Sequence, residues 1–226
     1  MQITIAAIGS RGDVQPYLAL ALGLKAAGHS VTLIAGENFR AWITGMGVDF
    51  APTVDIEMLM NSPDGRKWVE QGHNTRTQFR QMRWITEQIA ETATKTLIDT
   101  ARSSDVMLTG LAAEAFLHAI REKYGTRLIA AALQPYQRSR SGAASLNIIT
   151  PGTSRLNGWM GALVTRMLFG VYRPPLKKLR AQLDLPPLRF SEYLKARDAT
   201  PYLYGVSRHV LPHPSDWSPQ CRSSLS

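Results

Sequence analysis

The 226-residue sequence contains few of the residues that hold small secreted domains together. Cys221 is the only cysteine, which excludes an intrachain disulfide and a metal cluster of thiolates, and a reducing cytoplasm fits this usage. Acidic residues are also scarce, at 17 against 26 lysines and arginines, so the formal net charge is +9. A basic surface of this kind faces phosphate-bearing ligands, anionic lipid or simply solvent.

Long hydrophobic runs are missing as well. The two longest apolar-rich stretches, Val106–Ile120 and Trp159–Tyr172, are too short to span a bilayer, and they are interrupted by Glu114 and Arg166. Met1 runs directly into an apolar segment, so no targeting leader is expected. With 44% hydrophobic and 19% charged residues, the composition is that of a globular chain with one substantial core. We therefore expect a soluble or peripheral protein.

Short apolar runs alternate with segments of helical periodicity along most of the chain. This order predicts an α/β fold with a doubly wound parallel sheet. A helix ending at Gly28 is expected to follow the first strand, and the Pro174-Pro175 pair is expected to bend or break the last helix. Loops are expected at 55–72 and 134–155. Strands are expected at 3–8, 30–35, 47–52, 105–109, 127–132 and 202–206, and further helices at 37–45, 75–102, 112–124 and 156–183.

The first 28 residues carry the most specific signal. A buried strand ends at Ile8 and is followed by the predicted tight loop Gly9-Ser10-Arg11-Gly12-Asp13. Pro16 suits the first turn of the next helix, because its missing N–H group is unpaired there in any case. In open α/β sheets such a loop lies at the carboxyl edge of the strands, where ligands bind.

The glycine spacing matches the dinucleotide fingerprint G-x-G-x-x-G only in part, because Ala7 stands where the first glycine is required. The longer string GSRGDVQPYLALALGLKAAGHSVTL, however, resembles the N-terminal motif of the glycosyltransferase family 28 type enzymes. These include sterol glucosyltransferases and enzymes that glycosylate macrolide and glycopeptide aglycones. The resemblance extends over about residues 1–219 and includes Gln134-Pro135 and the string VLPHPSDW at 210–217.

The resemblance implies the N-terminal, acceptor-binding half of a two-domain GT-B fold. It places a Rossmann-like domain at 1–206 and an interdomain exit segment at 207–226, ending in a polar tail outside the family pattern. The second domain, which would hold the nucleotide sugar, is expected to be missing through truncation, a frameshift or cloning. The polar tail Cys221–Ser226 is not expected to form a strand.

Asp13 is the candidate catalytic residue. The resemblance implies that its carboxylate acts as the base that deprotonates an acceptor hydroxyl, whereas the spacing to Pro16 also fits a helix-capping role. Ser10 is expected to contact the donor diphosphate or the acceptor. Arg11 is expected either to neutralise phosphate or to pair with a surface carboxylate. Gly9 and Gly12 complete the predicted donor- and substrate-binding loop.

The remaining polar residues indicate no other chemistry. The five histidines lack metal-ligand spacing, and no catalytic triad or Walker loop is present, so neither a metal nor a resident cofactor is expected. Several aromatic residues fit either a hydrophobic acceptor pocket or core packing. They are Trp68, Phe79, Trp84, Trp159 and Phe169.

The sequence thus predicts the acceptor domain of an inverting hexosyltransferase, incomplete alone. It would use a UDP- or dTDP-hexose as co-substrate and a lipid, sterol or polyketide-type hydroxyl as acceptor. A cytoplasmic location is expected, with peripheral membrane contact left open and no nucleic acid as partner. Two alternatives are retained: a truncated, non-catalytic module that binds lipid or aglycone, and a nicotinamide oxidoreductase. The oxidoreductase is disfavoured because Ile34-Ala35 end the second strand where an acidic ribose ligand is required.

Overall fold

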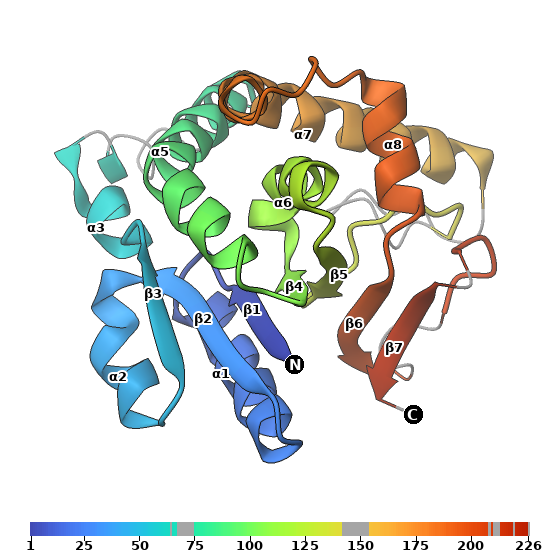
Figure 1. Ribbon diagram of the computed structural model, residues 1–226. Coiled ribbons are helices and arrows are strands. Elements are labelled where there is room, and N and C mark those ends of the chain that lie inside the picture. Colours follow the sequence, from blue (N-terminus) through green and yellow to red (C-terminus); the bar gives the residue numbers. More distant parts are fainter. Residues whose placement is uncertain are drawn as a thin grey trace. The chain divides into compact units, whose positions relative to one another are not determined.

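The computed structural model describes residues 1–63, 65–66, 75–141, 154–207, 209, 213–218 and 220–225, with the backbone alone for 75–79, 81 and 223–225 (Figure 1). The chain divides into two compact units. The first comprises Met1–Leu128 and Val171–Pro187, and the second comprises Ile129–Gly170 and Leu188–Ser226. Along the described residues, no helix carries an apolar stretch long enough to cross a bilayer.

The first unit contains a parallel sheet with the strand order β3-β2-β1-β4. Helices α1 and α2 lie on one face of these strands, and α5 and α6 lie on the other, as expected for a doubly wound sheet (Figure 1). The strands are β1 Gln2–Ala6, β2 Ser30–Gly36, β3 Asp49–Thr53 and β4 Val106–Thr109. The helices are α1 Arg11–Ala26, η1 Glu37–Phe39, α2 Arg40–Gly45, α3 Ile56–Asn61, α5 Thr75–Ala101 and α6 Leu111–Tyr124.

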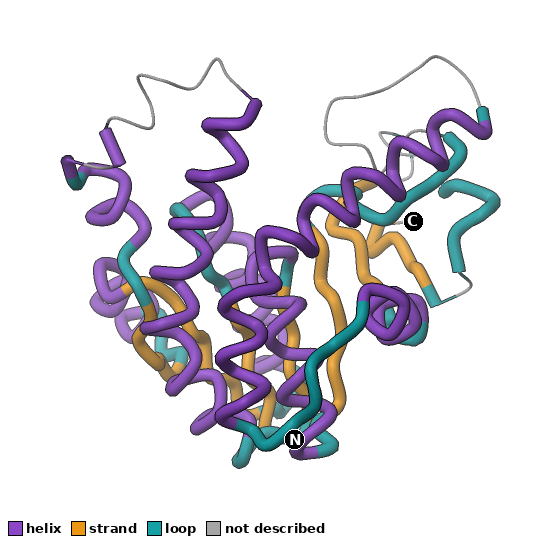
Figure 2. Tube along the Cα trace, turned by 90° about the horizontal axis from the view of Figure 1, so that it is seen from above, coloured by secondary structure: helices purple, strands orange, loops and turns teal. Residues whose placement is uncertain are grey.

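The second unit contains the parallel strand order β5-β6-β7. Its elements are β5 Arg127–Ala132, which starts in the first unit, α8 Phe190–Asp198, β6 Tyr202–Ser207 and β7 Cys221–Leu225. Helix α7, Arg155–Gln182, begins in the second unit and ends in the first. Figure 2 shows the described helices and strands along the Cα trace.

The core of the first unit explains why its strands read as continuous apolar runs. Ile5 of β1 and Leu33 of β2 are fully buried, and they are adjacent in the parallel register. Helices cover both faces of the sheet, so side chains that alternate along each strand are buried on either side. Apolar β-branched residues suit both the burial on two faces and the extended backbone of a strand. This is why the pattern predicted strands here.

The predicted α/β, Rossmann-like doubly wound parallel sheet is confirmed. Gly28 and Gly125 have positive φ just beyond the ends of α1 and α6, as their sequence positions indicated.

Several local expectations were wrong. Helix α1 begins at Arg11, so Arg11–Asp13 are helical and Pro16 lies beyond the first turn. The segment expected to be a loop at 55–72 contains α3, while 64 and 67–72 lie outside the described residues. Helix α8 was not anticipated, and the polar tail forms strand β7.

A further correction concerns Pro174-Pro175, which was expected to bend or break the last helix. The pair does not break α7, because the helix continues through it to Gln182. Proline has no N–H group, so the carbonyls of Gly170 and Val171 lose their normal helical partners. The boundary between the two units falls between these same two residues. The proline pair therefore marks the place where α7 passes from one unit to the other.

Arg180 on α7 is one of the basic residues that give the chain its positive net charge, but it does not lie on a solvated surface. Only 3% of the residue is exposed. Its guanidinium donates two hydrogen bonds to the Glu122 carboxylate, at 2.7 and 3.0 Å, and Nε donates to the carbonyl of Pro186. A bidentate pair of this kind fixes both distance and orientation. Arg180 thereby joins the end of α7 to α6 within the first unit.

We predict that Arg180→Ala lowers the free energy of unfolding by about 2–3 kcal/mol, because the Glu122 carboxylate and the Pro186 carbonyl lose their charged donor. Lys177→Ala, at an exposed position on the same helix, should change it by less than about 0.5 kcal/mol. Urea unfolding of both variants checks the difference. Equal stabilities would show that the buried pair does not hold α7 to α6.

Candidate functional site

The junction between β1 and α1 brings the predicted site residues together. After β1 ends at Ala6, the chain stays beside β2, because the Ala7 N–H donates to the Ile34 carbonyl at 2.9 Å. It then turns at Gly9-Ser10 and enters α1 at Arg11. The candidate loop is therefore shorter than expected, and its last three residues form the first turn of a helix.

Asp13 lies in this first turn and its side chain folds back onto Ser10. The carboxylate oxygen Oδ2 accepts hydrogen bonds from the Ser10 backbone N–H at 2.8 Å and from Ser10 Oγ at 3.0 Å. An acidic side chain here satisfies a backbone donor that the helix leaves unpaired and complements the positive end of the helix dipole. The structure thus shows the capping role that the sequence had left open. Both hydrogen bonds end on Oδ2, and Asp13 itself is exposed.

Gly9 makes this arrangement possible. A Cβ atom on Gly9 would lie 2.2 Å from Asp13 Oδ2 and 2.7 Å from Asp13 Cβ, well inside van der Waals contact. The carboxylate therefore packs directly against the glycine backbone. Gly12 is less constrained, because a Cβ there would meet only Ser10 Oγ, at 3.7 Å. Of the two loop glycines, Gly9 is the one the local geometry requires.

Arg11 and Tyr17 define the surroundings of Asp13. The guanidinium of Arg11 lies over the ring of Trp42, 5.2 Å from its centroid, rather than against the surface carboxylate that the sequence analysis had considered. Tyr17 lies one turn after Asp13 and is buried. Burial raises the pKa of the Tyr17 hydroxyl, and the negative charge of Asp13 raises it further. Sequence reasoning missed Trp42 and Tyr17, although the four-residue spacing of Asp13 and Tyr17 was a usable signal.

Two neighbouring strand ends share the edge at which this junction lies. β1 pairs in parallel with β2 and with β4, so their carboxyl ends lie on the same side of the sheet. β2 leads into Gly36, where a Cβ would lie 2.6 Å from Asn38 Oδ1, and β4 leads into Gly110 at the start of α6. Thr109 donates from Oγ1 to the Gly110 carbonyl at 3.1 Å. Close backbone packing thus recurs along this edge, where open α/β sheets bind ligands.

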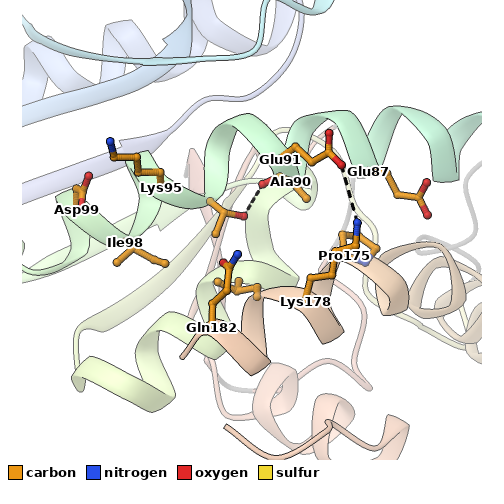
Figure 3. Close-up of a pocket in the computed structure, with 11 residues that line it drawn as sticks. Glu87, Ala90, Glu91, Lys95, Ile98, Asp99, Pro175, Lys178 and Gln182 are labelled. Carbon is orange, nitrogen blue, oxygen red and sulfur yellow. Dashed lines mark hydrogen bonds and ion pairs between the residues drawn. The ribbon is translucent and has the colours of Figure 1, made fainter. Parts of the chain in front are cut away.

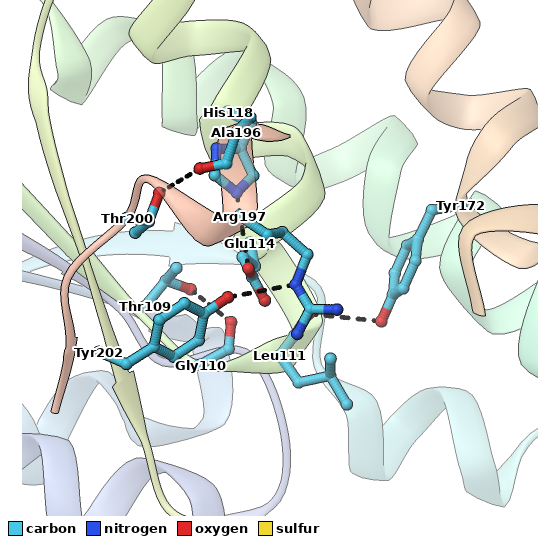
Figure 4. A network of polar contacts seen from close by, with 10 residues as sticks. All are labelled: Thr109, Gly110, Leu111, Glu114, His118, Tyr172, Ala196, Arg197, Thr200 and Tyr202. Carbon is cyan, nitrogen blue, oxygen red and sulfur yellow. Dashed lines mark hydrogen bonds and ion pairs between the residues drawn. The ribbon is translucent and has the colours of Figure 1, made fainter. Parts of the chain in front are cut away.

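Helix α6 carries a buried polar pair that was not anticipated as a pair. Nε2 of His118 lies 3.5 Å from Oε1 of Glu114, one helical turn away, and both side chains are almost fully buried (Figure 4). His118 is therefore a packed residue of this helix and not a surface residue. In the same unit, the Tyr172 hydroxyl donates to the Leu111 carbonyl at 3.4 Å, which ties α7 to the start of α6.

Figure 4 also shows a group that belongs to the second unit. Nε of the buried Arg197 donates to the Tyr202 hydroxyl at 3.2 Å, and the Thr200 hydroxyl donates to the Ala196 carbonyl at 2.8 Å. The Arg197 guanidinium also lies over the rings of Tyr136 and Tyr193. These contacts fix α8 on the end of β6.

A cavity of about 480 Å³ lies between α5 and α7 in the first unit (Figure 3). Its lining is strongly charged, and Lys178 Nζ lies 3.9 Å from Glu91 Oε1 in an exposed pair of the kind that contributes little to stability. No residue of Gly9–Asp13 lines it. This cavity is therefore a poor match for the apolar acceptor pocket that the sequence suggested.

The aromatic residues proposed for an acceptor pocket have separate positions. Phe169 is buried and stacks on Tyr193, with ring centroids 5.0 Å apart, so it is a core residue. Trp159 is exposed on α7, and Trp84 is half-buried on α5. Trp68 and the side chain of Phe79 lie outside the described residues, as does most of the expected loop 134–155.

The strand–glycine–helix junction at the edge of a doubly wound sheet defines a class of α/β proteins that bind ligands at this edge. Residues 3–135 match the model of the glycosyltransferase family 28 N-terminal domain. The match covers more than half of the chain, and the chain belongs to this family.

Curated relatives agree with this assignment. The chain is 30% identical over 224 residues to a sterol 3-beta-glucosyltransferase of Debaryomyces hansenii, covering 95% of this chain and 13% of that protein. It is 28% identical over 229 residues to the O-mycaminosyltylonolide 6-deoxyallosyltransferase of Streptomyces fradiae, covering 98% of this chain and 53% of that enzyme. The chain thus spans about half of one relative and a small part of the other.

A solved structure shows the same fold. The glycosyltransferase SsfS6 of Streptomyces sp. SF2575 superposes with a TM-score of 0.59 at 17% identity, covering 99% of this chain and 53% of that chain. A second structure of that enzyme, complexed with thymidine diphosphate, gives a TM-score of 0.52 at 19% identity over 84% of this chain and 47% of that chain. The expected GT-B N-terminal half is therefore confirmed as a fold.

We predict that Gly9→Ala lowers the free energy of unfolding by about 1–3 kcal/mol, because the new methyl group displaces the Asp13 side chain or shifts the junction. Gly23→Ala is the matched control, since Gly23 lies within α1 and a Cβ there has nothing within 4 Å. It should raise stability by about 0.5–1 kcal/mol. Thermal and urea unfolding would report the opposite signs, and a Gly9→Ala protein as stable as the parent would contradict the close packing.

Proposed function

We propose that residues 1–226 are the acceptor-binding part of an inverting glycosyltransferase, with Asp13 as the general base. The observation that carries the proposal is the position of Asp13. Its carboxylate is exposed at the carboxyl edge of the sheet and is oriented through Oδ2 by Ser10. Among the described residues no hydrogen bond reaches Oδ1, which leaves this oxygen to take a proton. A base held in a fixed direction suits proton transfer better than a freely rotating one.

The proposed reaction moves a hexose from a UDP- or dTDP-sugar to a hydroxyl of a lipid, sterol or polyketide-type acceptor. As the acceptor oxygen attacks the anomeric carbon, Oδ1 of Asp13 takes the hydroxyl proton. The bond from the anomeric carbon to the diphosphate breaks, and the nucleoside diphosphate leaves with the electron pair. Attack from the face opposite the leaving group inverts the anomeric centre. No metal or resident cofactor is needed in this scheme.

The rest of the junction supports the donor side of the proposal. Arg11 keeps its positive charge exposed while its guanidinium rests on Trp42, so it is available to a diphosphate. Ser10 and the backbone at Gly9 and Gly12 lie at the amino end of α1, where the helix dipole favours anions. We assign these four residues to donor or acceptor binding.

The names of the relatives support the substrate class, since one names a sterol and the other O-mycaminosyltylonolide as the acceptor. The thymidine diphosphate in SsfS6 supports a nucleotide sugar as donor. Because this chain matches only about half of that enzyme, we propose that a second part of the same kind supplies the donor site and that residues 1–226 alone do not turn over. The proposal places the protein in the cytoplasm, in peripheral contact with a membrane, without nucleic acid as a partner.

The test is an Asp13→Asn substitution in a chimera that joins this chain to the C-terminal half of the Streptomyces fradiae relative. Asparagine still accepts the hydrogen bonds from Ser10 but takes no proton. We expect turnover to fall by about 10²–10⁴-fold, or ~3–5 kcal/mol of transition-state stabilisation, with the acceptor KM nearly unchanged.

Asp55→Asn provides the matched control in the same chimera. Asp55 is the N-cap of α3, and its Oδ1 accepts the Met58 N–H at 3.0 Å, so the change alters a capping carboxylate outside the proposed site. Its turnover should remain within a few-fold of the parent chimera. An Asp13→Asn protein that folds and keeps full turnover removes Asp13 from the proton transfer and leaves it as a helix cap.

A further inference from the structure

The first half of α7 presents an apolar face to solvent. Leu156, Trp159, Leu163 and Met167 are 54, 62, 38 and 37% exposed, and their spacing of three, four and four residues places them on one face of the helix. The packed side of the same turns carries Asn157, Gly161 and Thr165, which are buried. Up to Met167 this is the reverse of an ordinary surface helix, whose apolar stripe faces the core, and buried apolar residues begin at Leu168 and Phe169. We call the four exposed residues the α7 stripe.

The packed side is polar for identifiable reasons. Asn157 donates from Nδ2 to the Arg140 carbonyl at 3.1 Å, and the Thr165 hydroxyl donates to the Gly161 carbonyl at 2.8 Å. Gly161 allows close approach, because a Cβ there would lie 3.0 Å from Arg138 Cβ and 3.2 Å from Arg138 Cα. The orientation of α7 is therefore fixed by specific contacts, and the α7 stripe is held outward.

The charged residues of α7 itself are all positive. Arg155 and Arg166 are both exposed, and their separation of eleven residues, close to three turns, places them on the same side of the helix. From Arg155 to Gln182 the sequence contains no aspartate or glutamate. An exposed apolar face bordered by arginines, with tryptophan among its apolar members, is typical of helices that lie in a membrane interface.

A cavity of about 410 Å³ lies at the start of the same helix and is lined by Arg138, Arg140 and Arg155, together with Ser139, Gly158 and Asp216. The Asp216 carboxylate is committed to the loop, because Oδ1 accepts from Ser139 Oγ at 2.8 Å and Oδ2 accepts from the Arg140 N–H at 2.7 Å. Three arginines and one aspartate thus line this cavity, and the excess positive charge suits phosphate.

We propose that the first half of α7 docks on the surface of an anionic phospholipid bilayer. The α7 stripe enters the boundary between headgroups and acyl chains, and lipid phosphates bind in the cavity lined by Arg138, Arg140 and Arg155. This deepens the peripheral membrane contact in the proposed function by naming the surface that makes it. It rests on that function only for its biological setting, since bilayer binding needs no sugar transfer.

The positive charge beside the α7 stripe favours a bilayer over a protein as the partner that covers this surface. Burying four apolar side chains would also suit a protein groove, but that groove would have to be acidic to match the arginines along the border and at the end of the stripe. An anionic bilayer provides both properties over its whole surface: an apolar interior and a layer of phosphates. Each lysine or arginine near such a surface adds to the attraction.

The first experiment is co-sedimentation of the full 226-residue chain with sucrose-loaded vesicles. We expect binding to vesicles of phosphatidylcholine mixed with phosphatidylglycerol, weaker binding to phosphatidylcholine alone, and loss of the difference at high salt. Trp159→Ser/Leu163→Ser/Met167→Ser should reduce the partition coefficient by at least about tenfold. Met46→Ser/Met58→Ser removes two exposed apolar side chains from other helical regions and should bind as the parent does.

The charge arm uses Arg140→Gln/Arg155→Gln, which should weaken binding to the mixed vesicles several-fold and flatten the salt dependence. Arg189→Gln is the control, since this exposed arginine lies away from the cavity lining and should have little effect. Inorganic phosphate at moderate concentration should not displace the protein from vesicles. Displacement would mean that the arginines bind free phosphate and would overturn the assignment to a bilayer.

The last arm places the contact on the helix. Acyl chains brominated near the headgroup should quench tryptophan fluorescence of the parent, and Trp159→Phe should remove most of the quenching while the protein stays bound. Quenching that persists in Trp159→Phe would place the contact elsewhere. The proposal would also be overturned if the parent chain bound neither kind of vesicle. It would be overturned as well if the parent formed a dimer and the triple serine variant of Trp159, Leu163 and Met167 did not. None of these outcomes bears on whether Asp13 is the base.

Discussion

The packing of the Asp13 carboxylate against the backbone of Gly9 is the contact on which the candidate site depends. Without a side chain on Gly9, the carboxylate reaches Ser10 and closes the first turn of α1. The same two hydrogen bonds serve two purposes, since they satisfy an unpaired backbone donor and fix the direction of the free oxygen. Asp13 can therefore cap the helix and also act as the proposed general base. The same contacts set the position of α1 and the orientation of the Asp13 carboxylate.

The second constraint is α7, which runs through both units and changes unit beside its two prolines. In the first unit it is joined to α6 through the pair of Arg180 with Glu122. In the second unit it packs first through the small and polar residues Asn157, Gly161 and Thr165, and then through the buried ring of Phe169. A helix fixed at both of its halves has little freedom to rotate. Its outward apolar face is thus a lasting feature of the surface, which gives the proposed bilayer contact a rigid base.

Part of the candidate site was accessible from the sequence because it is local. Gly9, Ser10 and Asp13 are close neighbours in the chain, and the strand, glycine and helix signals around them fall in the expected order. The start of α1 was misplaced because Pro16 suggested a first turn, whereas the capping by Asp13 starts the helix earlier. The contact of Arg11 with Trp42 was missed because it joins residues on separate elements that only the parallel sheet brings together.

By itself, the sequence determined the order of β1 to β6 and of the longer helices, the parallel doubly wound sheet and the glycine caps at Gly28 and Gly125, because these follow from local periodicity and backbone conformation. Only the tertiary structure decided which side of α7 is buried. Periodicity indicates that a helix has an apolar face, but the side that packs depends on where Gly161 and Asn157 find partners. It also decided that the polar tail becomes β7, since a strand of weak propensity forms when the neighbouring β6 offers a row of unpaired backbone groups.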